Sequence, residues 1–235
     1  MENFGSLILP LLLSALVGYL LGSISFAILL TKAFAHEDVR AHGSGNAGAT
    51  NVLRVAGKKA SALTFLLDFC KCVASVLVGY FLVKHACVAN GVDPEMARLG
   101  MYAAGFCCMI GHMYPLYFGF RGGKGVATLV GAIMGVNAPL VLLCFGVWFL
   151  VLMITHYVSL ASMVAGCSFP IFTLISPKVN HLVPFVVFSF IIAVLLIYTH
   201  RKNIERLKAG TESKIYIWKP RHVKQQPPKQ EKKEE

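Results

Sequence analysis

One short segment of the chain combines glycines with small polar side chains and ends in an arginine. It reads GSGNAGATNVLR over residues 43–54 and is called the first motif. Glycine permits backbone turns with positive φ, and successive amide groups in such turns can surround an anion. The alternative is a plain loop with a helix cap. The candidate anion ligands are Gly43, Ser44, Gly45, Asn46, Gly48, Thr50 and Arg54.

The second motif, GHMYPLYFGFRGGKGVAT over residues 111–128, contains a second glycine-rich run with a lysine. It is not a nucleotide-binding P-loop, because Lys124 is followed by Gly125 instead of Ser or Thr. Its amide groups still precede a predicted helix, where anions bind. The candidate phosphate ligands are Gly122, Gly123, Lys124 and Gly125. The alternative is a turn whose basic residues only orient the chain in a membrane.

The third motif, HRKNIERLKAGTE over residues 200–212, follows an apolar stretch. On a helix, His200 and Asn203 lie on one side because they are three positions apart. They are the candidates to orient a substrate hydroxyl, and the alternative is the basic flank of a membrane span. Ser162, in the turn Tyr157–Ser162, is a further candidate ligand or a helix cap.

The composition places these motifs in a membrane protein. Hydrophobic residues make up 56% of the 235 residues, charged residues only 14%, and the mean hydropathy is +0.66. Soluble domains carry about 25% charged residues, and disordered chains have low hydrophobicity, so both classes are excluded. The net charge of +11 is expected to orient the chain in the bilayer, and nucleic-acid binding is disfavoured. The seven cysteines form no CxxC pair.

A helix needs ~20 apolar residues to cross a bilayer. Apolar stretches of about this length occur at Phe4–Leu30, Ala60–Val83, Leu99–Phe118 and Leu182–Thr199. The second of these contains Asp68 and Lys71, which we expect to pair. A further stretch, Gly125–Pro177, is long enough for two or three spans. Gly135, Asn137, Pro139 and His156 are its expected breaks.

Charge parity decides the number of spans. Five Lys and Arg residues stand against two acidic residues in 31–59, and eleven against five after Thr199. Both segments should therefore be cytoplasmic. An all-α polytopic protein with seven transmembrane helices meets this condition, with residues 126–136 as a short fourth segment. The N-terminus would lie outside and the C-terminus in the cytoplasm. All three motifs would then meet at one membrane surface and form a phosphate site.

The three motifs, in this order and spacing, resemble the bacterial acyl-phosphate:glycerol-3-phosphate acyltransferases, which are integral membrane enzymes. The resemblance covers roughly residues 5–215. We therefore expect one domain over 1–215 and a basic, disordered cytoplasmic tail over 216–235. The tail lies outside the resemblance.

The resemblance implies transfer of a fatty acyl group from acyl phosphate to the 1-hydroxyl of sn-glycerol 3-phosphate. The products would be lysophosphatidic acid and inorganic phosphate, with no metal and no cofactor. It implies catalytic roles for Lys124, Ser44, His200 and Asn203, with the remaining candidates binding phosphate. The location would be the bacterial cytoplasmic membrane, with the active site facing the cytoplasm. The oligomeric state stays open, and a monomer is compatible with the sequence.

Two other functions remain open from the residues alone. A transporter of phosphate esters would need the same cationic site, although no internal repeat is visible. A scaffold acting through its basic tail would leave the three motifs unexplained.

Overall fold

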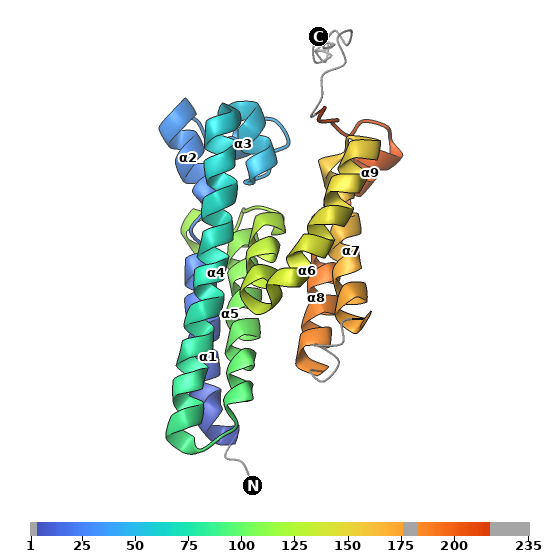
Figure 1. The fold of residues 1–235 in the computed structure, drawn as a ribbon. Coiled ribbons are helices and arrows are strands. Elements are labelled where there is room, and N and C mark those ends of the chain that lie inside the picture. The colour runs from blue at the N-terminus through green and yellow to red at the C-terminus, as the bar shows by residue number, and fades with distance from the viewer. Residues whose placement is uncertain (1–3, 176–182, 217–235) are drawn as a thin grey trace, which may run out of the picture.

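The computed structural model describes residues 4–175 and 183–216, which form helices and no strands (Figure 1). The all-α prediction is confirmed. The α-helices are α1 Ile8–Gly22, α2 Phe26–Ala35, α3 Ala49–Val55, α4 Gly57–Asn90, α5 Ala97–Met113, α6 Val126–Thr155, α7 Val158–Ile175, α8 Val183–Thr199 and α9 Arg201–Lys208. Short 3-10 helices lie at Phe4–Leu7, Val39–Ala41, Pro94–Met96 and Leu116–Phe118.

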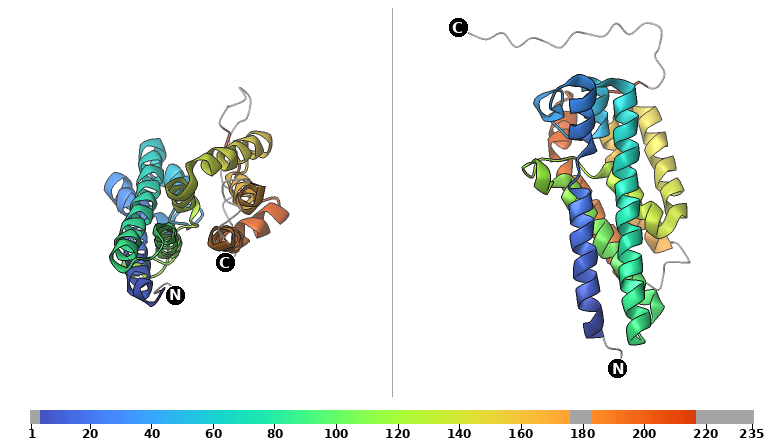
Figure 2. Two further views of the ribbon diagram at one scale, coloured as in Figure 1. Left: turned by 60° about the horizontal axis from the view of Figure 1, so that its bottom comes forward. Right: turned by 90° about the vertical axis from the view of Figure 1, so that its left-hand side faces the viewer.

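Helices α1, α4 and α5 pack side by side as one group (Figures 1 and 2). Their contacts use glycines: a Cβ at Gly18 or Gly22 would meet the α5 backbone at Ala104 or Cys108. Gly79 of α4 and Gly100 of α5 face one another in the same way. Small residues let membrane helices approach until their backbones touch, and this close packing holds such helices together.

The first apolar stretch, Phe4–Leu30, is divided instead of forming one straight span. Helix α1 ends at Gly22, and α2 begins at Phe26 beside α3 at the same end of the molecule (Figure 1). The break is stabilised because its polar groups have partners. The Ser23 hydroxyl donates to the Tyr19 carbonyl over 2.8 Å, and the Lys71 ammonium of α4 donates to the Ile24 carbonyl over 2.6 Å.

Helix α6 bends where the sequence predicts a break. Asn137 has extended backbone angles, φ −154° and ψ 87°, inside the helix, and Pro139 follows it. At the far end of α6, His156 adopts φ 62° and separates α6 from α7. Helices α6, α7 and α8 form a second group with an aromatic core that includes Phe169, Phe185 and Phe188.

Fewer than seven of the described helices are long and apolar enough to count as transmembrane helices. In the described ranges, four segments are long and apolar enough to cross a membrane: Gly5–Ala35, Gly57–Asn90, Val126–Thr155 and Val158–Ile175. Helices α8 and α9, bent by 55°, make a fifth if they count as one span. Two causes account for the difference: α5 has only 17 residues, and the expected short segment 126–136 is continuous with the rest of α6.

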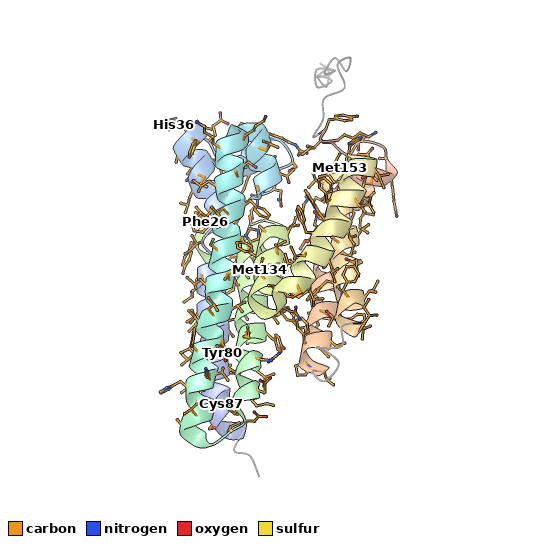
Figure 3. All side chains as sticks on the ribbon, viewed as in Figure 1. Phe26, His36, Tyr80, Cys87, Met134 and Met153 are labelled. Atoms are coloured by element: carbon orange, nitrogen blue, oxygen red, sulfur yellow. The ribbon has the colours of Figure 1, made fainter. Side chains whose placement is uncertain are left out.

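The two ends of the molecule differ. Helices α2, α3 and α9 lie at one end, and the N-terminal end of α1 lies at the other (Figures 1 and 2). Helix α4 connects both ends: Tyr80 and Cys87 lie toward the N-terminal end of α1, while Phe26 and His36 of α2 lie toward the opposite end (Figure 3). The predicted basic tail falls outside the described residues, apart from Tyr216.

Candidate active site

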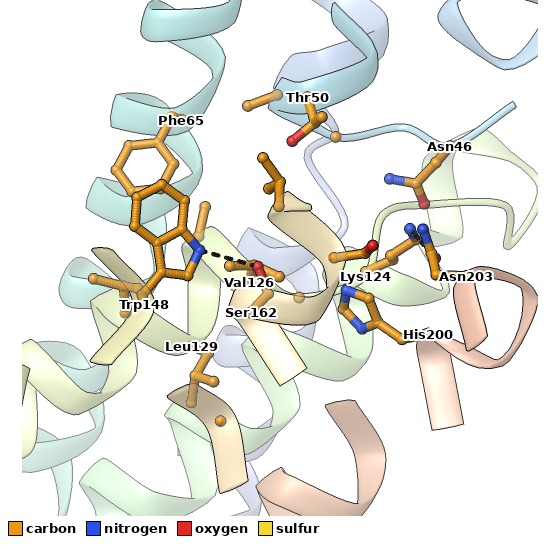
Figure 4. Close-up of a pocket in the computed structure, with 18 of the residues that line it drawn as sticks. Asn46, Thr50, Phe65, Lys124, Val126, Leu129, Trp148, Ser162, His200 and Asn203 are labelled. Carbon is orange, nitrogen blue, oxygen red and sulfur yellow. Dashed lines mark hydrogen bonds between the residues drawn. The ribbon is translucent and has the colours of Figure 1, made fainter. Parts of the chain in front are cut away.

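A cavity of about 530 Å³ lies between the two helix groups and is bordered by all three motifs. Figure 4 shows Asn46, Lys124, His200 and Asn203 on one side of it, and Phe65, Trp148 and Leu129 on the other. Eleven of the fourteen candidates line it: Gly43, Ser44, Asn46, Gly48, Thr50, Arg54, Lys124, Gly125, Ser162, His200 and Asn203. Gly45, Gly122 and Gly123 do not line it.

Asn51 shapes the first motif, a role that the sequence analysis did not assign. Its side-chain oxygen accepts the Ser44 N–H over 2.9 Å, and its amide nitrogen donates to the carbonyls of Val39 and His42 over 2.8 and 2.9 Å. These bonds close the loop around Gly43, which has φ +60°. The Asn51 side chain thereby turns Ser44 and its neighbours toward the cavity.

Gly122 and Gly123 of the second motif allow close packing against α5, and their amides are not available to bind an anion. The Gly122 N–H donates to the Met113 carbonyl and the Gly123 N–H to the His112 carbonyl, each over 3.1 Å. These two amides are therefore not free for a phosphate. A Cβ on either glycine would collide with the end of α5. Gly119, with φ +67°, and Gly125, with φ +86°, use the left-handed region, and Gly125 directly precedes α6.

Lys124 is fixed by the third motif. Its ammonium donates to the Asn203 side-chain oxygen, and its carbonyl accepts the Thr199 hydroxyl over 3.1 Å. Burial lowers the pKa of Lys124 to about 8; Glu212 opposes this shift, and Arg206 and Arg54 reinforce it. The lysine is thus a partly desolvated cation at the cavity wall, suited to attract an anion.

Glu212 holds the third motif together and was not among the predicted residues. Its carboxylate accepts hydrogen bonds from Ser159, Asn203 and Arg206, each over 2.7 Å. Burial would raise the pKa of Glu212, but these hydrogen bonds outweigh it and hold the pKa below its usual value. The carboxylate therefore stays ionised and orients Asn203 toward Lys124.

His200 and Asn203 are both buried and line the cavity. They do not share one helix as expected: His200 lies at the 55° bend between α8 and α9, and Asn203 is in α9. The Nδ1 atom of His200 lies 2.8 Å from the Leu196 carbonyl oxygen. A carbonyl only accepts hydrogen bonds, so Nδ1 carries the hydrogen and Nε2 of the neutral ring keeps its lone pair.

Arg54 also lines the cavity, and within 4–175 and 183–216 its guanidinium forms no ion pair or hydrogen bond. Burial lowers the pKa of its guanidinium, which still carries a charge at neutral pH. Arg54 and Lys124 thus give the polar side of the cavity two cations from two different motifs.

The other side of the cavity is apolar. Its wall includes Phe65 of α4 and Phe145 and Trp148 of α6. The Trp148 indole donates to the Ser162 hydroxyl over 3.2 Å, which explains how Ser162 lies at the wall (Figure 4). Phe65 and Phe145 are not closed off by packing: they are 44% and 57% exposed while they line the cavity. The apolar side of the cavity is therefore accessible and can accommodate an apolar chain.

Asp68 and Lys71 pair as predicted, 2.7 Å apart. Among the described residues, no group of three His, Cys, Asp or Glu side chains could hold a metal ion.

Known proteins share both the sequence and the fold. A family model described as glycerol-3-phosphate acyltransferase matches residues 12–210. The glycerol-3-phosphate acyltransferase of Clostridioides difficile (strain 630) is 46% identical over 216 residues, covering 92% of this chain and 98% of that protein. The enzyme of the same name from Rhizobium etli is 44% identical over 207 residues, covering 87% and 91%.

Two crystal structures of PlsY, an integral membrane glycerol 3-phosphate acyltransferase, have folds similar to that of this chain. Its glycerol 3-phosphate form has a TM-score of 0.75 and 38% identity, covering 88% of this chain and 96% of that one. Its lysophosphatidic acid form has a TM-score of 0.72 and 37% identity, covering 88% and 95%. The matches extend over all three motifs and the helices that carry them. The chain therefore belongs to the PlsY family of integral membrane glycerol-3-phosphate acyltransferases.

Proposed function

We propose that this chain transfers a fatty acyl group from acyl phosphate to the 1-hydroxyl of sn-glycerol 3-phosphate, giving lysophosphatidic acid and inorganic phosphate. One observation carries the proposal: a single cavity joins a cationic side, with Arg54 and Lys124, to an apolar side, with Phe65, Phe145 and Trp148, that suits a fatty acyl chain. Glycerol 3-phosphate and lysophosphatidic acid are the molecules named for the two PlsY crystal structures.

The two cations divide the two phosphates between them. Arg54 binds the phosphate of glycerol 3-phosphate, since a guanidinium matches two phosphate oxygens at once. Lys124 and the amides at the start of α6 bind the phosphate of the donor, because a helix N-terminus and an ammonium both attract anions. The residues of the first motif complete the polar wall. Among them, Ser44 shares with Lys124 the binding of the donor phosphate. The acyl chain lies along Phe65, Phe145 and Trp148.

The reaction is a direct substitution at the acyl carbon. The 1-hydroxyl oxygen attacks, a new ester C–O bond forms, and the C–O bond to phosphate breaks with its electron pair leaving on phosphate. In the bound substrate the 1-hydroxyl donates its hydrogen bond to Nε2 of His200. As the ester bond forms, this proton passes through Nε2 to the departing phosphate, so the histidine ends neutral as it began. Asn203 fixes Lys124. Holding both substrates in line supplies most of the acceleration, on the order of 7–11 kcal/mol in favourable cases.

The membrane arrangement is also a proposal. Seven membrane segments result if α6 counts as two pieces divided at Asn137 and if α5 crosses the bilayer. The N-terminus then lies outside the bacterial cytoplasmic membrane, and the active site faces the cytoplasm. The position of α2, α3 and α9, at the end opposite to the start of α1, supports this orientation, and so does the basic character of residues 31–59. The enzyme needs no metal or nucleotide and can work as a monomer.

The test is an assay of purified protein in detergent with palmitoyl phosphate and glycerol 3-phosphate, without metal or nucleotide. We expect inorganic phosphate and lysophosphatidic acid in equal amounts, and only with both substrates. Phosphate release without glycerol 3-phosphate would indicate a hydrolase. No release from folded protein, together with counterflow of labelled glycerol 3-phosphate in proteoliposomes, would indicate a transporter.

A further inference from the structure

A buried side-chain network lies behind the second motif and has no role in the mechanism above. It consists of Asp68 and Lys71 on α4 and His112 on α5, which are 1%, 6% and 4% exposed. Asp68 and His112 both line the cavity. Buried charges persist in proteins where other groups compensate them, so the partners of each atom define what this network can do.

Lys71 fixes the position of the hydrogen on the His112 ring. An ammonium has three hydrogens to donate and cannot accept. The Lys71 Nζ lies 2.7 Å from the Asp68 Oδ1, 2.6 Å from the Ile24 carbonyl oxygen and 3.2 Å from the His112 Nδ1. The Asp68 Oδ1 lies farther from Nδ1, at 3.5 Å. Nδ1 therefore accepts from Lys71, and the hydrogen of the neutral ring is on Nε2.

The Nε2 atom of His112 lies against the second motif. A Cβ placed on Gly123 would collide with Nε2, so the ring edge touches this glycine, next to Lys124. The Gly123 N–H also donates to the His112 carbonyl over 3.1 Å. In the part of the chain that the structure describes, no hydrogen bond engages Nε2. A hydrogen-bond donor of a buried side chain at the cavity wall is thus left for a ligand.

We infer that His112 is a phosphate-binding residue: its Nε2–H donates to an oxygen of the donor phosphate held by Lys124. Lys71 and Asp68 are positioning residues that fix the ring and its hydrogen. The donor phosphate is favoured over the phosphate of glycerol 3-phosphate because His112 lies beside Gly123 and Lys124, whereas Arg54 belongs to α3. The inference rests on the proposed function and adds a ligand to its phosphate site.

Two substitutions separate the two ring nitrogens. His112→Gln extends an amide to about the position of Nε2 and keeps a donor there. His112→Asn is shorter, so it keeps a polar group near Nδ1 for Lys71 but loses the donor at the cavity. Both keep a polar side chain beside the ion pair, so both should fold, which thermal unfolding in detergent verifies. The steady-state constants are measured for palmitoyl phosphate and glycerol 3-phosphate, with inorganic phosphate as a product inhibitor.

We expect His112→Asn to lower kcat/KM for palmitoyl phosphate roughly 10- to 100-fold, the effect of one hydrogen bond to a charged group. Its inhibition constant for inorganic phosphate should rise by a similar factor, and KM for glycerol 3-phosphate should stay within about twofold. His112→Gln should keep kcat/KM within about fivefold of wild type.

The inference is wrong if the folded Asn and Gln variants behave alike, or if His112→Asn changes both substrates equally. Met113→Ala is the packing control, because Met113 is buried at the end of α5 and its sulfur would lie 3.7 Å from a Cβ on Gly125. If Met113→Ala reproduces the selective loss of phosphate inhibition, the effect is one of packing and the inference fails. Wild-type protein that makes no lysophosphatidic acid would instead overturn the proposed function.

Discussion

Lys124 should give the enzyme an upper pH limit that an ordinary lysine would not. A lysine in water keeps its charge to above about pH 10. Burial lowers the pKa of Lys124 to about 8. The shift is downward, so the charged form is present below pH 8 and is lost as the pH rises through it. Capture of the donor phosphate should be lost over the same range.

The size of the effect follows from this pKa. Roughly nine-tenths of the free protein carries the Lys124 charge at pH 7, and about one-tenth at pH 9. Since kcat/KM reports the free enzyme, it should fall tenfold for each pH unit above about 8. Phosphate monoesters gain their second charge near pH 6, so the profile should be a bell between about 6 and 8. Bound phosphates favour the ammonium, so kcat at saturation should fall only at higher pH.

The assay follows inorganic phosphate release at palmitoyl phosphate concentrations below KM, in detergent and at constant ionic strength. Lys124→Arg is the matched variant, because a guanidinium stays charged through this range. It should show a lower plateau, since the larger group displaces Asn203, and no decline near pH 8. A wild-type profile that is flat to about pH 9.5, or the same decline in Lys124→Arg, would refute the reasoning.

Three further predictions concern Gly123, Asn51 and the C-terminal tail. Gly123→Ala should lower activity about 100-fold or more, because the added methyl meets the His112 ring, whereas Gly146→Ala, with open space around it, should match wild type in the phosphate-release assay. Asn51→Ala removes three hydrogen bonds of a buried side chain and leaves the loop around Ser44 without its support; it should destabilise the protein by about 1–3 kcal/mol, and an unchanged thermal midpoint in detergent would contradict this. Deletion of residues 219–235 should leave kcat within about twofold, since the family match ends at residue 210; a large loss would assign the tail a catalytic role.

The sequence could predict that the three motifs meet, because this depends on how Lys and Arg are distributed along the whole chain. Excess Lys and Arg in 31–59 and after Thr199 assign both segments to one surface, and the second motif follows by alternation. The structure brings Arg54, Lys124 and Asn203 to one cavity. Helical periodicity alone did not predict the geometry of His200 and Asn203, because the chain bends by 55° at His200, yet both side chains line the same cavity.

The roles of single polar residues could not be predicted, because they depend on contacts between distant segments. Glu212 bonds to Ser159 across 53 positions, and nothing in the local sequence of either residue indicates the other. The break after Gly22 is hidden because apolar residues flank it on both sides, and its partner, Lys71, is on another helix. Gly122 and Gly123 look like amide donors in sequence, yet contact with the end of α5 explains them.

The accessible apolar wall that Phe65 and Phe145 give the cavity affects how the enzyme should be measured. A donor whose chain reaches the wall from the side travels by two-dimensional diffusion within one leaflet. Its effective concentration is then its mole fraction among lipids or detergent, and adding more detergent at fixed total donor dilutes it. Glycerol 3-phosphate arrives from water and obeys its bulk concentration. The same cavity therefore receives its two substrates on two different concentration scales, and only one of them responds to the volume of the aqueous phase.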